Sequence, residues 1–292
     1  MLVAVTAASG QLGRKVVKSL LEKLPASDIV AIVREPARAA DLGVAVRVAD
    51  YRDPAALRAA LAGVERVLLI SGSADFGKRA AEHENVVNAA KAANVGRIVY
   101  TSILHVDEWY LPIAEDHRRT EAFLMISDIP FTILRNGWYW ENHTFSAVAA
   151  LENGVLLDAV GNGRISWASR RDFADAAAAV LVNEGHTGKI YELAGDTSHT
   201  LDDLAFEVSR QTGKPLIYRD LSEAELADFF HRIGMPADFA AILAETNAKG
   251  LRKNILRDDS ATLSTLIGRP TTSLGEAVDE ALRSRPVATV LP

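Results

Sequence analysis

The chain opens with a regular succession of short apolar runs and longer amphipathic segments. Apolar runs over residues 2–6, 28–34 and 44–50 predict three strands. Residues 11–24 carry apolar side chains at helical spacing, and residues 54–61 predict a short helix that begins with a proline. Strand and helix signals therefore alternate from the start.

The alternation continues to residue 136. Residues 65–71, 97–102 and 130–136 predict three more strands, and residues 79–95 predict a long helix between two of them. Apolar strands separated by helical segments of about 10–15 residues are typical of a parallel, doubly wound sheet. We therefore predict an α/β protein with a Rossmann-like fold.

The order is looser after Asn136. An aromatic-rich, mainly helical segment comes first, and residues 165–169 and 189–195 then predict two strands around a helix. From about Thr200 the pattern is mainly helical, which indicates a smaller lobe over the carboxyl edge of the sheet. We expect a dinucleotide-binding domain over residues 1–155, with 165–194 returning to it, and a smaller substrate-binding lobe over 195–292, with 136–164 contributing.

The loop between the first predicted strand and helix, residues 7–13, has the form A-x-x-G-x-x-G. Its backbone N–H groups would point at a pyrophosphate, aided by the positive end of the helix that begins near Gln11. Such a loop at the first strand–helix junction of a doubly wound sheet predicts a dinucleotide site. The candidate contacts in this stretch are Thr6, Ser9, Gly10, Gln11 and Leu12.

This loop has two of the usual three glycines. Gly10 would let the backbone approach the phosphates, and Gly13 would let the helix pack close to the sheet. Ala7 stands in the place of the first glycine. If that position needs a positive φ, the alanine costs about 1 kcal/mol; otherwise the cost is small.

The end of the second predicted strand indicates which dinucleotide binds. An NAD site has a carboxylate there for the ribose hydroxyls, whereas an NADP site has a cation for the 2′-phosphate. Arg34 stands at this point and Arg38 follows, which favours NADPH, while Glu35 keeps NADH as an alternative. Asp50 and Tyr51 would lie near the adenine. Solvated surface arginines and an ordinary turn are the alternative interpretations.

Composition narrows the classes of partner. The 292 residues are 49% hydrophobic, with a net charge of −6 and no run of Lys or Arg, so nucleic acid is not an expected partner. The chain has no cysteine, which fits a reducing compartment, and its scattered histidines indicate no metal site. No apolar stretch approaches the ~18 residues of a membrane span, and the N-terminus lacks a signal-peptide pattern. We expect a cytoplasmic protein without a membrane partner.

The usual proton donor of a carbonyl reductase is missing. Short-chain dehydrogenases that interconvert carbonyls and alcohols use a Tyr-x-x-x-Lys pair. None of the six tyrosines has a lysine four residues later. His117 and Glu121 have this spacing instead, so His117 is a candidate acid, with a merely solvated histidine as the alternative. The candidate catalytic residues are His117 and Tyr139.

The missing proton relay bears on the acceptor. A ketone that accepts a hydride becomes a strongly basic alkoxide, whereas a quinone yields a delocalised, weakly basic anion that water protonates. Reduction of a quinone or a cationic dye requires mainly that a flat ring bind against a nicotinamide. An aromatic cluster would wall such a pocket, with core packing as the alternative; its members are Trp109, Tyr110, Trp138, Tyr139, Trp140 and Phe145.

Several stretches are specific enough to compare with known families: "VTAASGQLG", "AIVREPA", "LLISGS", "HENVVNAAKAANV", "YTSILH" and "IPFTILRNGWYWEN". They resemble the NmrA-like branch of the atypical short-chain dehydrogenases, and within it the bacterial NAD(P)H-dependent quinone oxidoreductases, with triphenylmethane dye reductase as a near relative. The resemblance implies a Rossmann domain, a small helical substrate lobe, and NADPH across the carboxyl ends of the strands. It implies pyrophosphate contacts from Gly10, Gln11 and Leu12 and a 2′-phosphate contact from Arg34.

The same resemblance implies which residues surround the nicotinamide and its ribose. They are Ser71 with its neighbour Gly72, Thr101, Asn136 and Gly137. Arg170 belongs to "SRRDF", which resembles a family element near the cofactor; a charge cluster at a helix start is the alternative.

Two hypotheses of function follow. The first is an NADPH-dependent oxidoreductase that reduces quinones or similar electron-poor conjugated acceptors by hydride transfer, with a small aromatic molecule as its partner. The second is an NmrA-like regulatory protein that senses NAD(P) without catalysis and acts through a protein partner. The absent proton relay argues against a third class, a sugar-nucleotide epimerase-like enzyme. A homodimer is compatible with either of the first two.

Overall fold

The computed structural model describes residues 1–72 and 76–284. Contacts between residues divide the chain into two compact units, each built from three segments. The first unit comprises Met1–Asn136, Arg170–Leu193 and Thr262–Arg269, and the second comprises Gly137–Ser169, Ala194–Ala261 and the described residues from Pro270 to 284.

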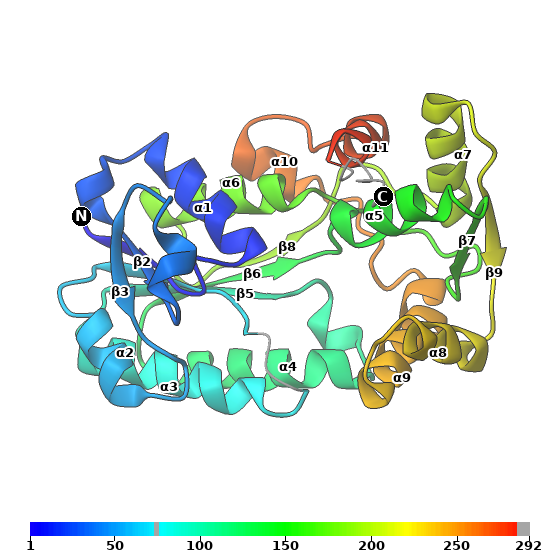
Figure 1. Cartoon of the computed structure of the whole chain (residues 1–292). Coiled ribbons are helices and arrows are strands. Elements are labelled where there is room, and N and C mark those ends of the chain that lie inside the picture. Colours follow the sequence, from blue (N-terminus) through cyan, green and yellow to red (C-terminus); the bar gives the residue numbers. More distant parts are fainter. Residues whose placement is uncertain (73–75, 285–292) are drawn as a thin grey trace. The chain divides into compact units, whose positions relative to one another are not determined.

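A parallel sheet forms the centre of the first unit (Figure 1). Within the described residues it has seven strands in the order β3-β2-β1-β4-β5-β6-β8, and each adjacent pair is parallel. This order of parallel strands confirms the predicted Rossmann-like sheet. Its central strands are mainly apolar, as expected for strands that helices cover on both faces. The strands are β1 (Val3–Val5), β2 (Ile29–Val33), β3 (Ala45–Val48), β4 (Arg66–Leu69), β5 (Arg97–Ile103), β6 (Phe131–Asn136) and β8 (Ile190–Leu193).

Helices cover both faces of this sheet (Figure 1). One layer contains α1 (Gln11–Leu21), α6 (Arg170–Val182) and α10 (Thr262–Ile267). The other contains α2 (Pro54–Ala60), α3 (Arg79–Ala92) and α4 (Pro112–Ile126). Buried side chains such as Leu57, Val86, Tyr100 and Leu124 fill the space between the second layer and the sheet. Short 3-10 turns complete the unit at Ala26–Asp28, Pro36–Ala39 and Val106–Glu108.

An ion-pair cluster holds α10 in the first unit. Arg269 places its Nη1 2.7 Å from Asp172 and its Nη2 2.5 Å from Asp175, and the Ser19 hydroxyl donates to Asp175 at 2.6 Å. Thr262–Arg269 therefore packs on α6, although the sequence pattern places it in the smaller lobe. The first segment of this unit also ends at Asn136 instead of residue 155, because α5 (Trp140–Ala150) packs on helices of the second unit.

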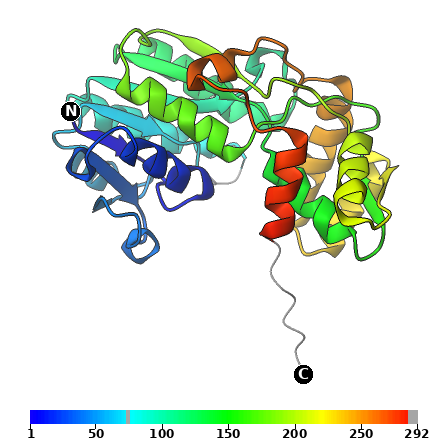
Figure 2. The same cartoon turned by 90° about the horizontal axis from the view of Figure 1, so that it is seen from above.

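The second unit is mainly helical. Figure 2 shows α11 (Leu274–Arg283) beside α5 and α7 (Leu201–Thr212). Capping boxes at Thr200, Ser222 and Ser273 begin α7, α8 (Glu223–Arg232) and α11. Each hydroxyl accepts a hydrogen bond from the N3 amide, and the N3 carboxylate accepts one from the N-cap amide. The other elements are β7 (Val155–Asp158), β9 (Ile217–Asp220), α9 (Ala237–Glu245), a π-helical turn (Thr246–Gly250) and a 3-10 turn (Leu251–Lys253).

The strands of the second unit differ from the prediction. Residues 165–169 make only isolated bridges, Tyr139 with Ala168 and Ile165 with His199, instead of a regular strand. The sequence pattern also misses the parallel pair of β7 and β9. No helix in the described part of the chain has the length and hydrophobicity that crossing a membrane requires.

Candidate functional site

The turn between β1 and α1 brings backbone unusually close to backbone. A Cβ atom on Gly13 would lie 2.5 Å from the Ala7 carbonyl oxygen and 2.7 Å from the Ala8 Cα, so only glycine fits without a shift. The amide of Gly10 donates to the Ala7 carbonyl at 2.9 Å and closes the turn. Gly10 is also the N-cap of α1 and supplies no side-chain acceptor, so the first amides of the helix stay available to an anion.

Ala7 adopts the left-handed conformation that glycine favours. Its φ is +47°, so the condition under which an alanine here is costly is met. The predicted contacts around it differ in exposure: Gln11 is exposed, Ser9 is half-buried and Leu12 is buried.

The tip of β2 presents a free cation. Arg34 directly follows the strand, is exposed, and forms no ion pair within the described residues. Glu35 lies 4.0 Å from Arg38. The Asp50 carboxylate receives two hydrogen bonds from the Arg52 guanidinium, at 2.9 and 2.8 Å, and these bonds lower the pKa of Asp50 to about 2. Arg34 therefore has no ion-pair partner among the described residues, although its charge also helps to lower the pKa of Asp50.

Two other predicted contacts, Thr6 and Tyr51, form hydrogen bonds within the first unit. The Tyr51 hydroxyl contacts the Thr6 hydroxyl and donates to the carbonyl of Ile70 at 2.8 Å, while the Ile70 amide donates to Thr6 Oγ1 at 3.1 Å. These bonds join the end of β1 to the end of β4. The polar groups of Thr6 and Tyr51 are thus engaged within the protein.

Ser71 and Gly72, which follow β4, are held by side chains of β5 and α3. The Ser71 amide donates to Thr101 Oγ1 at 2.9 Å, and the Gly72 amide donates to His83 Nε2 at 3.0 Å. Since Nε2 accepts, His83 carries its proton on Nδ1 and donates it to Thr120 Oγ1, 2.9 Å away. Burial lowers the pKa of His83 to about 4, which keeps the ring neutral in this role.

Three buried polar atoms at the carboxyl ends of β4, β5 and β6 have no hydrogen-bond partner within residues 1–72 and 76–284. They are Ser71 Oγ, Ser102 Oγ and Asn136 Oδ1. Buried polar groups without partners are uncommon in folded proteins. Three of them along adjacent strand ends fit a ligand that brings hydroxyl and amide groups, such as a ribose joined to a nicotinamide.

His117 lies inside the first unit instead of on its surface. It is buried on α4, and its Nδ1 is 2.8 Å from the Tyr100 hydroxyl. Burial lowers the pKa of His117 to about 3, so the ring is neutral near pH 7. Glu121, one turn further along α4, accepts two hydrogen bonds from the Arg135 guanidinium at 3.0 and 2.6 Å. The spacing of His117 and Glu121 thus reflects two separate buried contacts.

The aromatic residues divide between core and surface. Trp109 and Trp140 are each 1% exposed, and their indole N–H groups donate to the carbonyls of Leu104 and Thr272 at 2.8 and 3.0 Å. Trp140 also stacks on Trp167 with ring centroids 4.8 Å apart. Phe145 is half exposed, and Tyr110 is 94% exposed. Trp138 and Tyr139 are half-buried in the second unit, as Arg170 is in the first, and Gly137 is buried.

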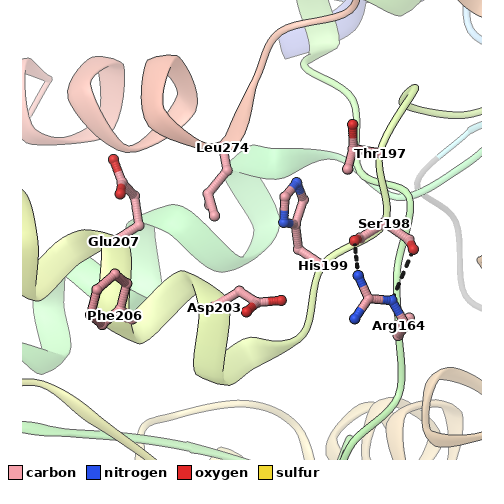
Figure 3. A pocket seen from close by; sticks show the side chains of 8 residues that line it. All are labelled: Arg164, Thr197, Ser198, His199, Asp203, Phe206, Glu207 and Leu274. Carbon is pink, nitrogen blue, oxygen red and sulfur yellow. Dashed lines mark hydrogen bonds between the residues drawn. The ribbon is translucent and has the colours of Figure 1, made fainter.

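An open cavity of about 320 Å³ lies within the second unit (Figure 3). The Arg164 guanidinium on its wall donates to Ser198 Oγ at 3.0 Å, and Asp203 and Glu207 are engaged by Thr200 and Arg210. None of the sequence-predicted acceptor residues lines it. The lining residues are Arg164, Thr197, Ser198, His199, Asp203, Phe206, Glu207 and Leu274.

Sequence reasoning missed several residues that shape the carboxyl edge. Ser102 follows Thr101 in "YTS", and His83 lies in "HENVV", so both stand inside stretches that carry the family resemblance. Arg135, directly before Asn136, is buried and pairs with Glu121 and Glu192. Its place inside an apolar strand was a signal, since a buried arginine requires carboxylate partners.

The strand order, the uncapped start of α1 and the unpartnered atoms at the strand ends together define a nucleotide-binding unit of the Rossmann class. Residues 7–184 match the family model described as NAD(P)H-binding, and the chain belongs to that family.

Known relatives cover nearly the whole chain. Quinone oxidoreductase 2 of Escherichia coli K12 is 52% identical over 280 residues, which are 95% of this chain and 97% of the relative. Among solved structures, the NADPH-dependent quinone oxidoreductase of E. coli complexed with NADPH has a TM-score of 0.92 at 52% identity and covers 96% of this chain and 100% of its own. The Citrobacter triphenylmethane reductase complexed with NADP(H) has a TM-score of 0.91 at 38% identity, covering 96% and 99%. The family resemblance inferred from the sequence is confirmed.

Replacing Ala7 by Gly should raise the free energy of unfolding by about 0.5–1 kcal/mol. Relief of the left-handed alanine contributes about 1–2 kcal/mol, and the extra freedom of glycine in the unfolded chain offsets about 0.4–1 kcal/mol of it. Urea unfolding measures the change. Ala8→Gly, at the next and fully buried position, is the matched control and should destabilise. A loss of stability in Ala7→Gly equal to that of the control would contradict the strained turn.

Acidification from pH 7 to pH 5 should destabilise the protein partly through His83 and His117. Both folded pKa values lie below the reference of about 6.5, so the unfolded chain takes up these protons first. The contribution of the two neutral histidines to the free energy of unfolding is complete above about pH 6.5 and falls as the pH drops toward their folded pKa values. At pH 5 each histidine lowers the free energy of unfolding by about 2 kcal/mol. Urea unfolding at pH 7 and pH 5 measures the loss of free energy of unfolding, and this loss should be about 2 kcal/mol smaller in His117→Gln than in the wild type. An unchanged difference would rule out the neutral, buried ring.

Proposed function

We propose that the protein is an NADPH-dependent reductase that transfers a hydride to quinones or similar electron-poor conjugated acceptors. The observation that carries the proposal is the near full-length similarity to an NADPH-dependent quinone oxidoreductase. The absence of a Tyr-x-x-x-Lys pair supports the same class of acceptor, because hydride transfer to a quinone needs no strong positioned acid.

Binding is the main task of the first unit in this proposal. The free amides of Gln11 and Leu12 at the start of α1 would hold the pyrophosphate beside the Gly10 backbone, and Arg34 would pair with the 2′-phosphate. Ser71, Ser102 and Asn136 would provide hydrogen bonds to the nicotinamide and its ribose, with Thr101 and His83 fixing the segment after β4. NADPH, when bound, supplies the hydride. The remaining predicted contacts, Gly137 and Arg170, stay part of this proposal.

The proton for the reduced acceptor comes from water in this scheme. His117 is neutral and its Nδ1 is engaged with Tyr100, so it is poorly suited to give a proton. A hydroquinone anion is delocalised and weakly basic, and water protonates it without a dedicated acid. Turnover of a quinone by His117→Gln should therefore stay within about threefold of the wild type. Tyr139 remains a candidate contact from the second unit.

The proposal extends to the cellular compartment and the oligomeric state of the protein. The cysteine-free sequence supports a reducing compartment, and we place the protein in the cytoplasm. A homodimer is proposed as its assembly, which sedimentation of the purified chain tests.

The deciding experiment follows NADPH absorbance in the presence of a panel of quinones. We expect oxidation of NADPH that depends on both the quinone and the protein. Tight NADPH binding without oxidation by any acceptor would overturn the proposal and favour a regulatory protein that senses NAD(P).

Arg34→Ala should weaken NADPH binding much more than NADH binding. Only NADPH carries the 2′-phosphate, and a charge-assisted pair with a guanidinium is worth about 1.5–3 kcal/mol, so the Kd of NADPH should rise about 10- to 100-fold. Fluorescence titration with each cofactor gives the comparison. Arg58→Ala, an exposed arginine on α2 of the same unit, should leave both Kd values unchanged. Equal effects of Arg34→Ala on NADPH and NADH would contradict the assignment.

A further inference from the structure

Two exposed side chains, Glu108 and Tyr110, flank the buried Trp109 on the loop that follows β5. We propose that this loop is the acceptor contact of the first unit: the Tyr110 ring packs on a flat acceptor, and Glu108 disfavours acceptors that carry a negative charge. The inference rests on the proposed reductase function and names residues that select its substrate.

The backbone on both sides of Tyr110 is fixed. The Trp109 indole donates to the Leu104 carbonyl at 2.8 Å, and the Arg118 guanidinium donates to the carbonyls of Trp109 and Val106, the latter at 3.2 Å. Arg118 is itself 2.7 Å from Glu115, and Pro112 begins α4 two residues after Tyr110. The exposure of Tyr110 is therefore a property of an anchored loop.

Tyr110 is 94% exposed on this anchored backbone. A tyrosine ring that packs usually removes 150–250 Å² from water, so an exposed ring beside a buried tryptophan leaves much apolar surface available. Because the backbone is already ordered, a ligand that stacks on the ring loses little binding free energy to ordering the loop.

The loop stands at the edge where the hydride would be delivered. It leaves the carboxyl end of β5, where the Ser102 hydroxyl has no hydrogen-bond partner among the described residues. Its first residues are tied to neighbouring strands, since the Leu104 amide donates to the Asn136 carbonyl and the His105 amide to Glu192, each at 2.9 Å. Ligands of doubly wound sheets lie outside these carboxyl ends, and Figure 1 shows α4 beginning beyond the end of β5.

The charges around the loop are mainly negative, which disfavours anionic acceptors. The Arg135 guanidinium forms ion pairs with three carboxylates, those of Asp107, Glu121 and Glu192, at 2.9, 2.6 and 2.8 Å. One positive charge against three negative ones leaves the cluster negative. Glu108 adds an exposed carboxylate that has no ion pair within the described residues. An anionic acceptor would approach against this field, and an uncharged one would not.

The test compares menadione, an uncharged quinone, with 1,2-naphthoquinone-4-sulfonate, an anionic one. Tyr110→Ala should raise the KM for menadione about tenfold and leave the Kd of NADPH unchanged, whereas Tyr110→Phe, which keeps the ring, should behave like the wild type. Glu108→Gln should lower the KM for the sulfonate about threefold at low salt and leave menadione unchanged, with the difference lost in 0.5 M NaCl. Ile126→Ala, a 76% exposed residue at the other end of α4, is the control and should change neither value.

Failure of this inference is separable from failure of the proposed function. Calorimetric binding of both quinones to the protein saturated with NADP⁺ needs no turnover, so it reports on Tyr110 and Glu108 even if no acceptor is reduced. Equal quinone affinities for wild type, Tyr110→Ala and Glu108→Gln would overturn the inference alone. A rise in the Kd of NADPH in Tyr110→Ala that matches the rise for menadione would also overturn it, because the loop would then belong to the cofactor site.

Discussion

The approach of α1 to the turn behind β1 is the constraint on which the rest of the site depends. A side chain at Gly13 would overlap the Ala7 carbonyl oxygen and the Ala8 Cα, so the helix can lie on the turn only because that side chain is absent. The position of α1 in turn directs its free amides at the carboxyl edge of the sheet. Arg34 after β2 and the buried polar atoms at the ends of β4, β5 and β6 stand along the same edge of the sheet.

The sheet of the first unit could be predicted from the sequence because its central strands, β1, β2, β4, β5 and β6, are buried. Such strands are rich in apolar residues and can be recognised without knowing their partners, and amphipathic helices separate them along the chain. β7 and β9 could not be found in this way, since each is a short strand that pairs with a segment about 60 residues distant, Val155 with Ile217 at one end. Residues 165–169 have a strand-like composition, but they form only isolated bridges, and local composition does not show which segments lie beside them.

The chemistry of the edge was predictable where it depends on backbone and strand position. Gly10 and Gly13 lie at the junction of β1 and α1, and Arg34 directly follows β2, as the sequence pattern predicts. Side-chain burial was not predictable from local sequence. Trp109 and Tyr110 are adjacent and equally aromatic, yet one lies in the core and the other in solvent. His117 looked like a surface acid on a charged helix, and only the packing of α4 against Tyr100 makes it a neutral interior group.

The interleaving of the two units has a consequence for how this architecture can be modified. The chain passes from one unit to the other after residues 136, 169, 193, 261 and 269, so neither unit is a continuous stretch. A single cut or fusion point therefore cannot separate them, and an exchange of the second unit between relatives would have to replace three segments together. Recombination that preserves both cores is confined to those crossings, which favours change of acceptor preference by point substitution over wholesale shuffling.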